Sequence, residues 1–288
     1  MKKLKYLIIG GDMRNFYLSE LLKKEYHRVE IYGFDKKNNV PSKNLTQVSA
    51  DCDITVCGIP LLSPSGFINM PYSEETLSSS TLSEVIPKQT LLIAGKIDKE
   101  TRQSLKNKDI AYVDLLEREE MAVLNAIPAA EGAVELIIKS IPRTIHSSRI
   151  LILGYGRIGK VLARILAGFN AEVWVSARKF SDLSWIEACG HRPVHLNDLE
   201  RYVSDMNVII NTIAHQYITP DILNKIRTDS YLIDLASVPG GIDFEYAKKL
   251  GLKTDWALSL PGKVAPLTAA EIIKKTIDNA ISERGRKR

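Results

Sequence analysis

The feature that most constrains how this chain can fold is a Gly-x-Gly-x-x-Gly turn at residues 154–159. Residues 150–154 read as a buried strand, and the residues after the turn show helical periodicity. Gly154 permits a tight turn, Gly156 lets backbone approach a pyrophosphate, and Gly159 lets the helix pack on the sheet. The helix N-terminus adds free N–H groups and the positive end of its dipole. A purely structural turn is the alternative, but the flanking strand and helix favour dinucleotide binding.

The end of the next predicted strand indicates which dinucleotide binds. A fold of this kind that prefers NAD carries Asp or Glu about 20 residues further on, to bind the ribose hydroxyls. Ser176 stands at that position here, and Arg178 and Lys179 follow it. The missing carboxylate removes repulsion of a 2′-phosphate, and arginine offers a forked, charge-assisted grip on it. A solvated basic turn is the alternative, but the two changes together favour NADP(H) over NAD(H).

Strand and helix patterns alternate through both halves of the chain, which predicts parallel sheets with helices on both faces. With 288 residues, 45% of them hydrophobic, the chain is long enough for two domains. We therefore expect an α/β protein with two doubly wound parallel-sheet domains, 1–142 and 143–288, the second a Rossmann dinucleotide-binding domain. A long helix over 117–140, which Pro128 should kink or restart, joins them. A last helix over 268–282 is expected to return toward the first domain, and the active cleft is expected between the domains.

Charge and cysteine usage exclude several classes of function. The net charge is only +5, and no basic stripe interleaved with aromatic residues marks a nucleic-acid site. The three cysteines, Cys52, Cys57 and Cys189, have no metal-ligand spacing, so no metal site is expected. No segment is expected to reach the length of a membrane span, and the N-terminus lacks a secretory signal. The chain is therefore expected to be cytoplasmic and to bind neither membrane nor nucleic acid.

Ligands of an open α/β sheet bind beyond the carboxyl ends of its strands, which adds three later loops to the cofactor site. The predicted cofactor-binding residues are Gly154, Tyr155, Gly156, Arg157, Ile158, Gly159, Ser176, Ala177, Arg178, Lys179, Thr212, Ile213, Ala236, Pro261 and Gly262. His215 and Lys263 are the catalytic candidates, because imidazole titrates near neutrality and the lysine offers a charge to an anionic substrate. An exposed loop histidine is the alternative for His215. Asp234 is expected to cap a turn rather than to react.

Four residues of the first half are candidates for binding an anionic substrate. Arg14 follows a Gly10-Gly11 turn and lies near a predicted helix N-terminus, where charge and N–H groups favour a carboxylate. The other three are Ser65, in a segment rich in Pro, Ser and Gly, Lys96, after a predicted strand, and Arg118. A second complete dinucleotide site is not expected at Gly10-Gly11, because the third glycine is missing.

Five stretches, spanning nearly the whole chain, together resemble the A subunits of dipicolinate synthase, a family of spore-forming bacteria. They are Ile9-Gly10-Gly11-Asp12-Met13-Arg14; Asn125-Ala126-Ile127-Pro128 with Glu131-Gly132; Gly154 to Gly159; Asp234-Leu235-Ala236-Ser237 with Pro239-Gly240-Gly241-Ile242-Asp243-Phe244; and Leu260-Pro261-Gly262-Lys263-Val264-Ala265-Pro266. The chain departs from the pattern where Ala129 replaces a hydroxyl-bearing residue and where Ala270 replaces a glycine. Neither departure touches the nucleotide turn.

The resemblance implies an NADP-linked oxidation of dihydrodipicolinate to dipicolinate, a pyridine dicarboxylate, in the mother-cell cytoplasm during sporulation. It also implies that the partner is a separate, flavoprotein-like B subunit. A substrate with two carboxylates suits the basic residues chosen above. Because the product is aromatic, the reaction is strongly downhill and calls for orientation more than for a tuned acid–base pair. We also expect a homo-oligomer.

Two other functions remain open. The first is an amino-acid or 2-hydroxy-acid dehydrogenase, since residues 234–241 and 260–264 are similar to loops of alanine dehydrogenase. That family has a reactive aspartate where this chain has Val238, which argues against amine chemistry. The second is a non-catalytic protein that senses NADP and regulates a partner.

Overall fold

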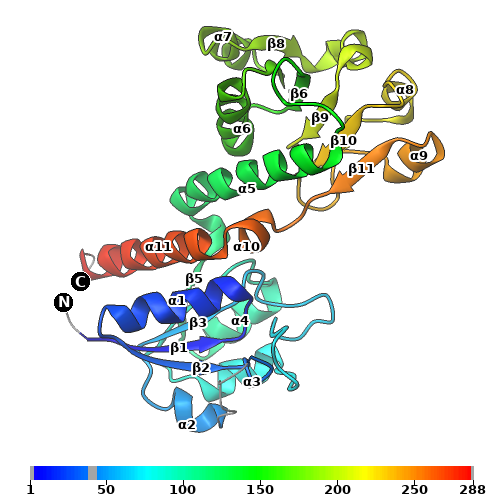
Figure 1. The fold of residues 1–288 in the computed structure, drawn as a ribbon. Helices are drawn as coiled ribbons and strands as arrows, with labels where there is room; N and C mark the ends of the chain where they lie inside the picture. Colours follow the sequence, from blue (N-terminus) through cyan, green and yellow to red (C-terminus); the bar gives the residue numbers. More distant parts are fainter. Residues whose placement is uncertain (1–2, 38–43, 287–288) are drawn as a thin grey trace. The chain divides into compact units, whose positions relative to one another are not determined.

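The computed structural model describes residues 3–37 and 44–286, and the chain divides into two compact units. Unit 1 comprises Met1–Leu124 and Ala265–Arg288, and unit 2 comprises Asn125–Val264. The chain enters unit 2 within the helix α5 (Glu119–Ser140) and leaves it before the last helix, α11 (Pro266–Arg286) (Figure 1).

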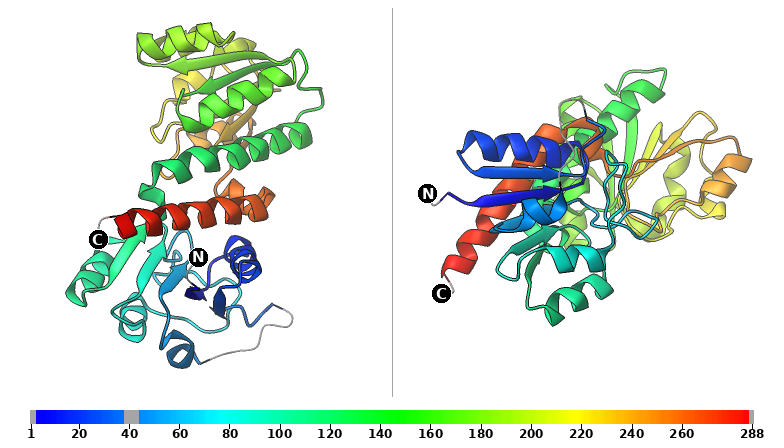
Figure 2. Two further views of the ribbon diagram at one scale, coloured as in Figure 1. Left: turned by 90° about the vertical axis from the view of Figure 1, so that its left-hand side faces the viewer. Right: turned by 90° about the horizontal axis from the view of Figure 1, so that it is seen from below.

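Unit 1 contains a five-stranded parallel sheet in the order β2-β1-β3-β4-β5. Its strands are β1 (Lys5–Ile9), β2 (Arg28–Tyr32), β3 (Ile54–Cys57), β4 (Leu91–Ala94) and β5 (Ala111–Asp114). Its helices are α1 (Met13–Lys24), α2 (Leu45–Ser49), α3 (Ser79–Val85), α4 (Lys99–Asn107), a 3₁₀ turn at Leu115–Glu117, and α11. Figures 1 and 2 show α11 running alongside α1.

Unit 2 contains a six-stranded parallel sheet in the order β11-β10-β9-β6-β7-β8. Its strands are β6 (Arg149–Leu153), β7 (Glu172–Ala177), β8 (Arg192–His195), β9 (Val208–Asn211), β10 (Tyr231–Asp234) and β11 (Lys253–Trp256). Its helices after α5 are α6 (Arg157–Gly168), α7 (Phe180–Ala188), 3₁₀ segments at Leu196–Arg201 and Val203–Asp205, α8 (Pro220–Leu223), α9 (Phe244–Lys249) and α10 (Leu260–Val264). This strand order reverses direction between β6 and β9, which makes their carboxyl ends the switch point of a Rossmann sheet.

Alternate residues of β6 show why helices cover both faces of the sheet. Ile150 and Ile152 lie in one buried cluster with residues of α5, α6 and α7. Leu151 and Leu153 lie in another with residues of α8, α9 and the 3₁₀ segments. Successive side chains of a strand point to opposite faces, so a strand that is apolar throughout needs cover on both. The predicted fold class, two parallel-sheet α/β domains with a Rossmann domain second, is confirmed.

The helix α5 belongs to both units, which is why they divide near residue 124 and not at residue 142. Met121 packs in the core of unit 1, whereas Ala133 and Ile137 pack in the core of unit 2. Pro128 lies inside the helix and does not end it, so of the two expected outcomes, a kink or a restart, the restart does not occur. Proline removes one backbone hydrogen bond, and packing of the neighbouring buried turns holds the helix together.

The same helix corrects the expectation that no segment reaches the length of a membrane span. By length and composition alone, α5 could cross a membrane, since the mean hydropathy of its most apolar 18-residue window is 1.5. Half of that window is buried inside the protein. Its buried residues, including Ala130 and Ala133, belong to a protein core. Burial of this kind is typical of a core helix.

Two smaller differences concern helix ends. Leu260–Val264 forms the short helix α10, where we expected a loop. Leu260 is buried against α5, where Gly132 leaves it room: a methyl group on Gly132 would lie 3.1 Å from Leu260 Cβ. Packing thus makes a helix of a segment whose own propensity is poor. The Thr219-Pro220 pair in the sequence predicts a helix that has Thr219 as its cap and Pro220 as its first residue. Pro220 is the first residue of α8, but the Thr219 side chain makes no capping hydrogen bond.

Candidate active site

The glycine turn after β6 is closely packed at its two ends. Gly154 has a φ of +99°, and its N–H donates to Ser176 O over 3.0 Å. A Cβ at Gly154 would lie 2.6 Å from Thr212 Oγ1, and one at Gly159 would lie 2.0 Å from Gly154 O. Such distances are far below van der Waals contact, so both positions require glycine for the turn itself.

The middle glycine of the turn is different, because it borders open space. Gly156 is the N-cap of α6 with ordinary extended backbone angles, and it supplies no side-chain cap. A Cβ added there would meet nothing within 4 Å. The first N–H groups of α6 therefore lie beside a space that a side chain would fill. A pyrophosphate fits this cradle, since backbone donors and the helix dipole both favour an anion there.

A pocket of about 450 Å³ opens beside this turn. Its lining comes from the carboxyl ends of β6, β7 and β9 and from the helix and loop that follow β7 and β8: Gly154, Tyr155, Gly156, Ala177, Arg178, Lys179, Asp182, Leu196, Thr212, Ile213 and Ala214. These include eight of the predicted cofactor residues. Burial and the hydrogen bond to Cys189 raise the pKa of Tyr155 to about 12, so its hydroxyl is a neutral donor at physiological pH.

The pocket wall at β7 starts one residue later than predicted from the sequence. Ser176 is fully buried and its Oγ has no hydrogen-bond partner among the described atoms. Ala177, Arg178 and Lys179 line the pocket instead. Asp182, which was not among the predicted residues, adds a carboxylate to the same wall. Its place in the first turn of a helix after a basic pair was the available signal.

A buried carboxylate organises the loop after β10. Asp234 is fully buried, and it accepts hydrogen bonds from Asn211 Nδ2 (2.8 Å), Ala236 N (2.9 Å) and Gly241 N (2.6 Å). Ala236 O in turn accepts a bond from Trp256 Nε1 over 2.9 Å. Asp234 thus holds both ends of the loop 235–241, which is the structural role expected for it. Ala236 is buried in this loop and does not line the pocket beside the glycine turn.

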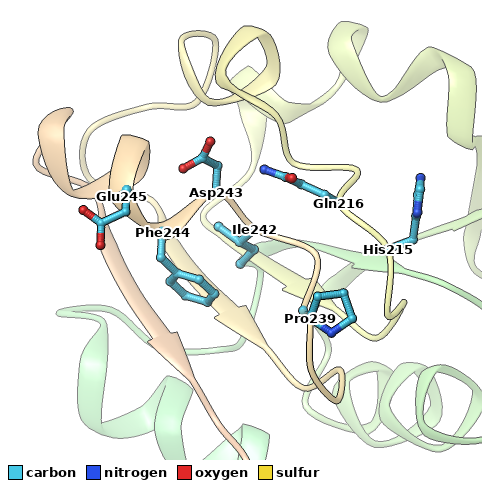
Figure 3. A pocket seen from close by; sticks show the side chains of 8 residues that line it. His215, Gln216, Pro239, Ile242, Asp243, Phe244 and Glu245 are labelled. Atoms are coloured by element: carbon cyan, nitrogen blue, oxygen red, sulfur yellow. The ribbon is translucent and has the colours of Figure 1, made fainter.

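His215 lines a second pocket in unit 2, of about 480 Å³. Figure 3 shows His215 and Gln216 on the loop after β9, with Pro239 on the neighbouring loop and Asp243 and Phe244 at the start of α9. The imidazole is exposed and packs edge-on against Tyr217, with ring centroids 4.9 Å apart. His215 is accessible to a small molecule.

The remaining unit 2 candidates lie in α10. Lys263 is exposed, and Pro261 and Gly262 are half-buried. The lining of neither pocket includes these three residues.

In unit 1, the Arg14 guanidinium is buried and already held by a carboxylate. Its Nε and Nη2 donate to Asp12, and Nη2 also donates to Ile59 O over 2.7 Å. Asp12 further caps α1 by accepting from Arg14 N. The ion pair with Asp12 fixes the Arg14 side chain at the start of α1 and compensates its charge.

Lys96 is one of six described non-glycine residues whose backbone is left-handed. It is a non-glycine residue with a φ of +56°, and its N–H donates to Asp114 Oδ1 over 2.9 Å. The charge of the buried Asp114 carboxylate is compensated by Arg102, whose Nη2 lies 2.6 Å from Asp114 Oδ2. A left-handed residue held this firmly costs roughly 1–3 kcal/mol, and such costs cluster at functional sites. The Lys96 side chain is exposed, as is Ser65, whose Oγ lies 2.8 Å from Ser63 Oγ.

Arg118 links two helices of unit 1. Its guanidinium bonds Glu120 at the start of α5 and Glu283 near the end of α11, at 2.5 and 2.7 Å. These two carboxylates raise the pKa of Arg118 above its usual value. The pairing assigns Arg118 to the junction of α5 with α11, so this residue is not part of the substrate site that we propose.

Among residues 3–37 and 44–286, no group of three or more His, Cys, Asp or Glu side chains is placed to hold a metal ion. The three cysteines are free thiols, Cys52 and Cys57 buried and Cys189 exposed.

Each half of the chain matches the model of a known protein family. Residues 5–116 match the family described as the N-terminal domain of the dipicolinate synthase A subunit. Residues 134–237 match the D-isomer specific 2-hydroxyacid dehydrogenase, NAD binding domain. Unit 2 therefore carries a nicotinamide-dinucleotide-binding domain of the dehydrogenase type.

Whole-chain comparisons agree with these matches. The dipicolinate synthase A subunit of Bacillus subtilis (strain 168) is 30% identical over 290 residues, covering 97% of this chain and 96% of that protein. The crystal structure of the A subunit from Bacillus halodurans superposes with a TM-score of 0.87 at 30% identity, over 96% of this chain and 97% of the other. The crystal structure of the Bacillus subtilis protein gives the same TM-score at 29% identity, over 100% and 99%. This chain belongs to the family of dipicolinate synthase A subunits.

Proposed function

We propose that this chain oxidises dihydrodipicolinate to dipicolinate. The substrate gives up a hydride and a proton, and the ring becomes aromatic. Bound NADP⁺ supplies the hydride acceptor. The observation that supports the proposal is the open cradle at Gly156, in a chain related over almost its whole length to the A subunit of dipicolinate synthase.

The proposed substrate-binding residues are Lys96 and Ser65, which are exposed on unit 1, and Arg14, whose guanidinium is held in place by Asp12. Lys96 and Ser65 are exposed, and Lys96 sits on a backbone that Asp114 holds in place. Arg14 provides a buried, preorganised guanidinium. His215 and Lys263 are the proposed catalytic residues: the His215 imidazole accepts the proton, and the Lys263 side chain orients a carboxylate.

Turnover tests the proposal directly. Purified chain, mixed with NADP⁺ and dihydrodipicolinate, is expected to produce NADPH absorbance and dipicolinate in equal amounts. The same assay is run in the presence of the B subunit. NADPH binding with no turnover, even with this partner present, would contradict the enzyme assignment and favour the NADP-sensing function. Turnover of an amino acid or 2-hydroxy acid in place of dihydrodipicolinate would favour the other alternative.

Within the proposed function, Arg178 gives the preference for NADP(H). The Arg178→Ala variant is expected to lose roughly ten- to a hundred-fold in NADPH affinity, the worth of charge-assisted hydrogen bonds to a phosphate, and to bind NADH unchanged. Fluorescence titration of the two reduced cofactors measures both constants. Arg201→Ala, another exposed arginine of unit 2, is the control and should change neither. Equal losses for both cofactors would remove Arg178 from the 2′-phosphate site.

The proposal also includes the partners and the setting of the family. A flavoprotein-like B subunit is the partner, the chain forms homo-oligomers, and both act in the mother-cell cytoplasm during sporulation. Sedimentation of the chain alone and with the B subunit tests the two associations separately.

A further inference from the structure

The side chain of His195 touches the residue that we assign to the 2′-phosphate. His195 ends β8, and its Cα pairs with that of Ala177 at the end of β7. Its Nε2 lies 3.1 Å from Arg178 O, and Asn197 N donates to its Nδ1 over 3.3 Å. Because Nδ1 accepts a bond, the ring proton sits on Nε2 and is donated to the Arg178 carbonyl.

The imidazole is also braced on its face. Phe180, the first residue of α7, stacks on His195 with ring centroids 5.7 Å apart and planes inclined by 26°. Phe180 is 80% exposed, an unusual position for an aromatic ring of this size. The His195 imidazole is therefore held by two hydrogen bonds and one stacked ring. Through its bond to Arg178 O, it holds the main chain of Arg178 in turn.

We propose that His195 is a positioning residue for recognition of the NADP 2′-phosphate, acting through the main chain of Arg178. This inference rests on the proposed role of Arg178. An arginine side chain loses conformational entropy when it binds a phosphate. If its backbone is already anchored, the entropy that is lost on binding is smaller. The Nε2 bond to Arg178 O holds the start of that side chain beside the pocket, whose wall also carries Lys179 and Asp182. NADH lacks the 2′-phosphate, so its affinity does not depend on this bond.

A pair of matched variants isolates the Nε2 bond. Glutamine places its amide nitrogen near the position of Nε2 and can still donate to Arg178 O. Asparagine is one bond shorter and replaces only the Nδ1 acceptor. Both remove the ring and its stacking on Phe180. His195→Asn is expected to lose about five-fold in NADPH affinity, the typical worth of one hydrogen bond, with NADH affinity unchanged. His195→Gln is expected to restore NADPH affinity to within about two-fold of the wild type, since its bond is retained.

Dissociation constants for NADPH and NADH, measured by fluorescence titration, and melting temperatures test the inference without any assay of turnover. Equal NADPH affinities for the Asn and Gln variants overturn it, as does an equal loss for NADH. If Arg178→Ala weakens NADPH binding and His195→Asn does not, only this inference fails. If Arg178→Ala leaves NADPH binding unchanged, the proposed NADP preference and this inference fail together.

Discussion

The Gly156→Ala variant is expected to fold normally and to lose roughly ten- to a hundred-fold in NADPH affinity, as an extra methyl group does in a close-packed contact. The backbone at Gly156 has ordinary angles, and the added methyl group meets no protein atom within 4 Å. It would instead occupy the space in which we place the pyrophosphate. Fluorescence titration with NADPH, together with thermal melting, separates the loss of affinity from any loss of stability.

Two other glycines of α6 provide the controls. Gly168→Ala adds a methyl group in open space at the last residue of the helix and should change neither quantity. Gly159→Ala should do the opposite of Gly156→Ala and destabilise the fold, because its methyl group would lie 2.0 Å from Gly154 O. Wild-type NADPH affinity in Gly156→Ala would show that the cofactor does not pass over this turn.

The Asp234→Ala variant is expected to destabilise unit 2 by about 3–6 kcal/mol, because three buried donors lose their acceptor at about 1–3 kcal/mol each and part of the loop relaxes. The donors are Asn211 Nδ2, Ala236 N and Gly241 N. Urea unfolding followed by tryptophan fluorescence reports on this unit alone. All three tryptophans of the chain, Trp174, Trp185 and Trp256, lie in unit 2.

The matched control is Asp221→Ala, an exposed aspartate in the first turn of α8, which should cost less than about 1 kcal/mol. The free energy of unfolding of Asp234→Asn should fall between those of Asp234→Ala and Asp221→Ala. Its side-chain oxygen still accepts hydrogen bonds, but its NH₂ group faces the Gly241 N–H, which is also a donor. An unfolding free energy of Asp234→Ala within about 1 kcal/mol of the wild type would mean that the loop 235–241 does not depend on this carboxylate.

Those parts of the fold that depend on local chemistry could be predicted from the sequence. The turn at 154–159 combines a strand, three glycines and a helix within a short stretch, so its identity does not depend on distant contacts. The alternation of buried strands with helices likewise carries the parallel topology of both sheets. Eight of the residues that the same local rules predicted for the cofactor line the pocket beside this turn.

Features set by long-range packing could not be predicted in this way. Ser176 was predicted to line the cofactor pocket, but its side chain is buried and does not. Strand side chains alternate between the two faces of a sheet, so an error of one residue places a side chain on the opposite face. Arg118 bonds Glu283, 165 positions away, and Arg14 bonds the carbonyl of Ile59, 45 positions away. No pattern near either arginine signals these partners. The helix α10 depends in the same manner on the space that Gly132 leaves for Leu260.

Unit 1 is discontinuous in sequence, and this has a consequence for the nascent chain. The core of unit 1 includes Ile273 and Ile277 of α11, which are translated only after all of unit 2. Unit 2 is one uninterrupted segment, so it can fold on the ribosome while the earlier-made unit 1 still lacks a helix. Until α11 is made, Leu18 and Leu22 of α1 lack its cover, so the part of unit 1 that is made first exposes apolar side chains that the finished protein buries.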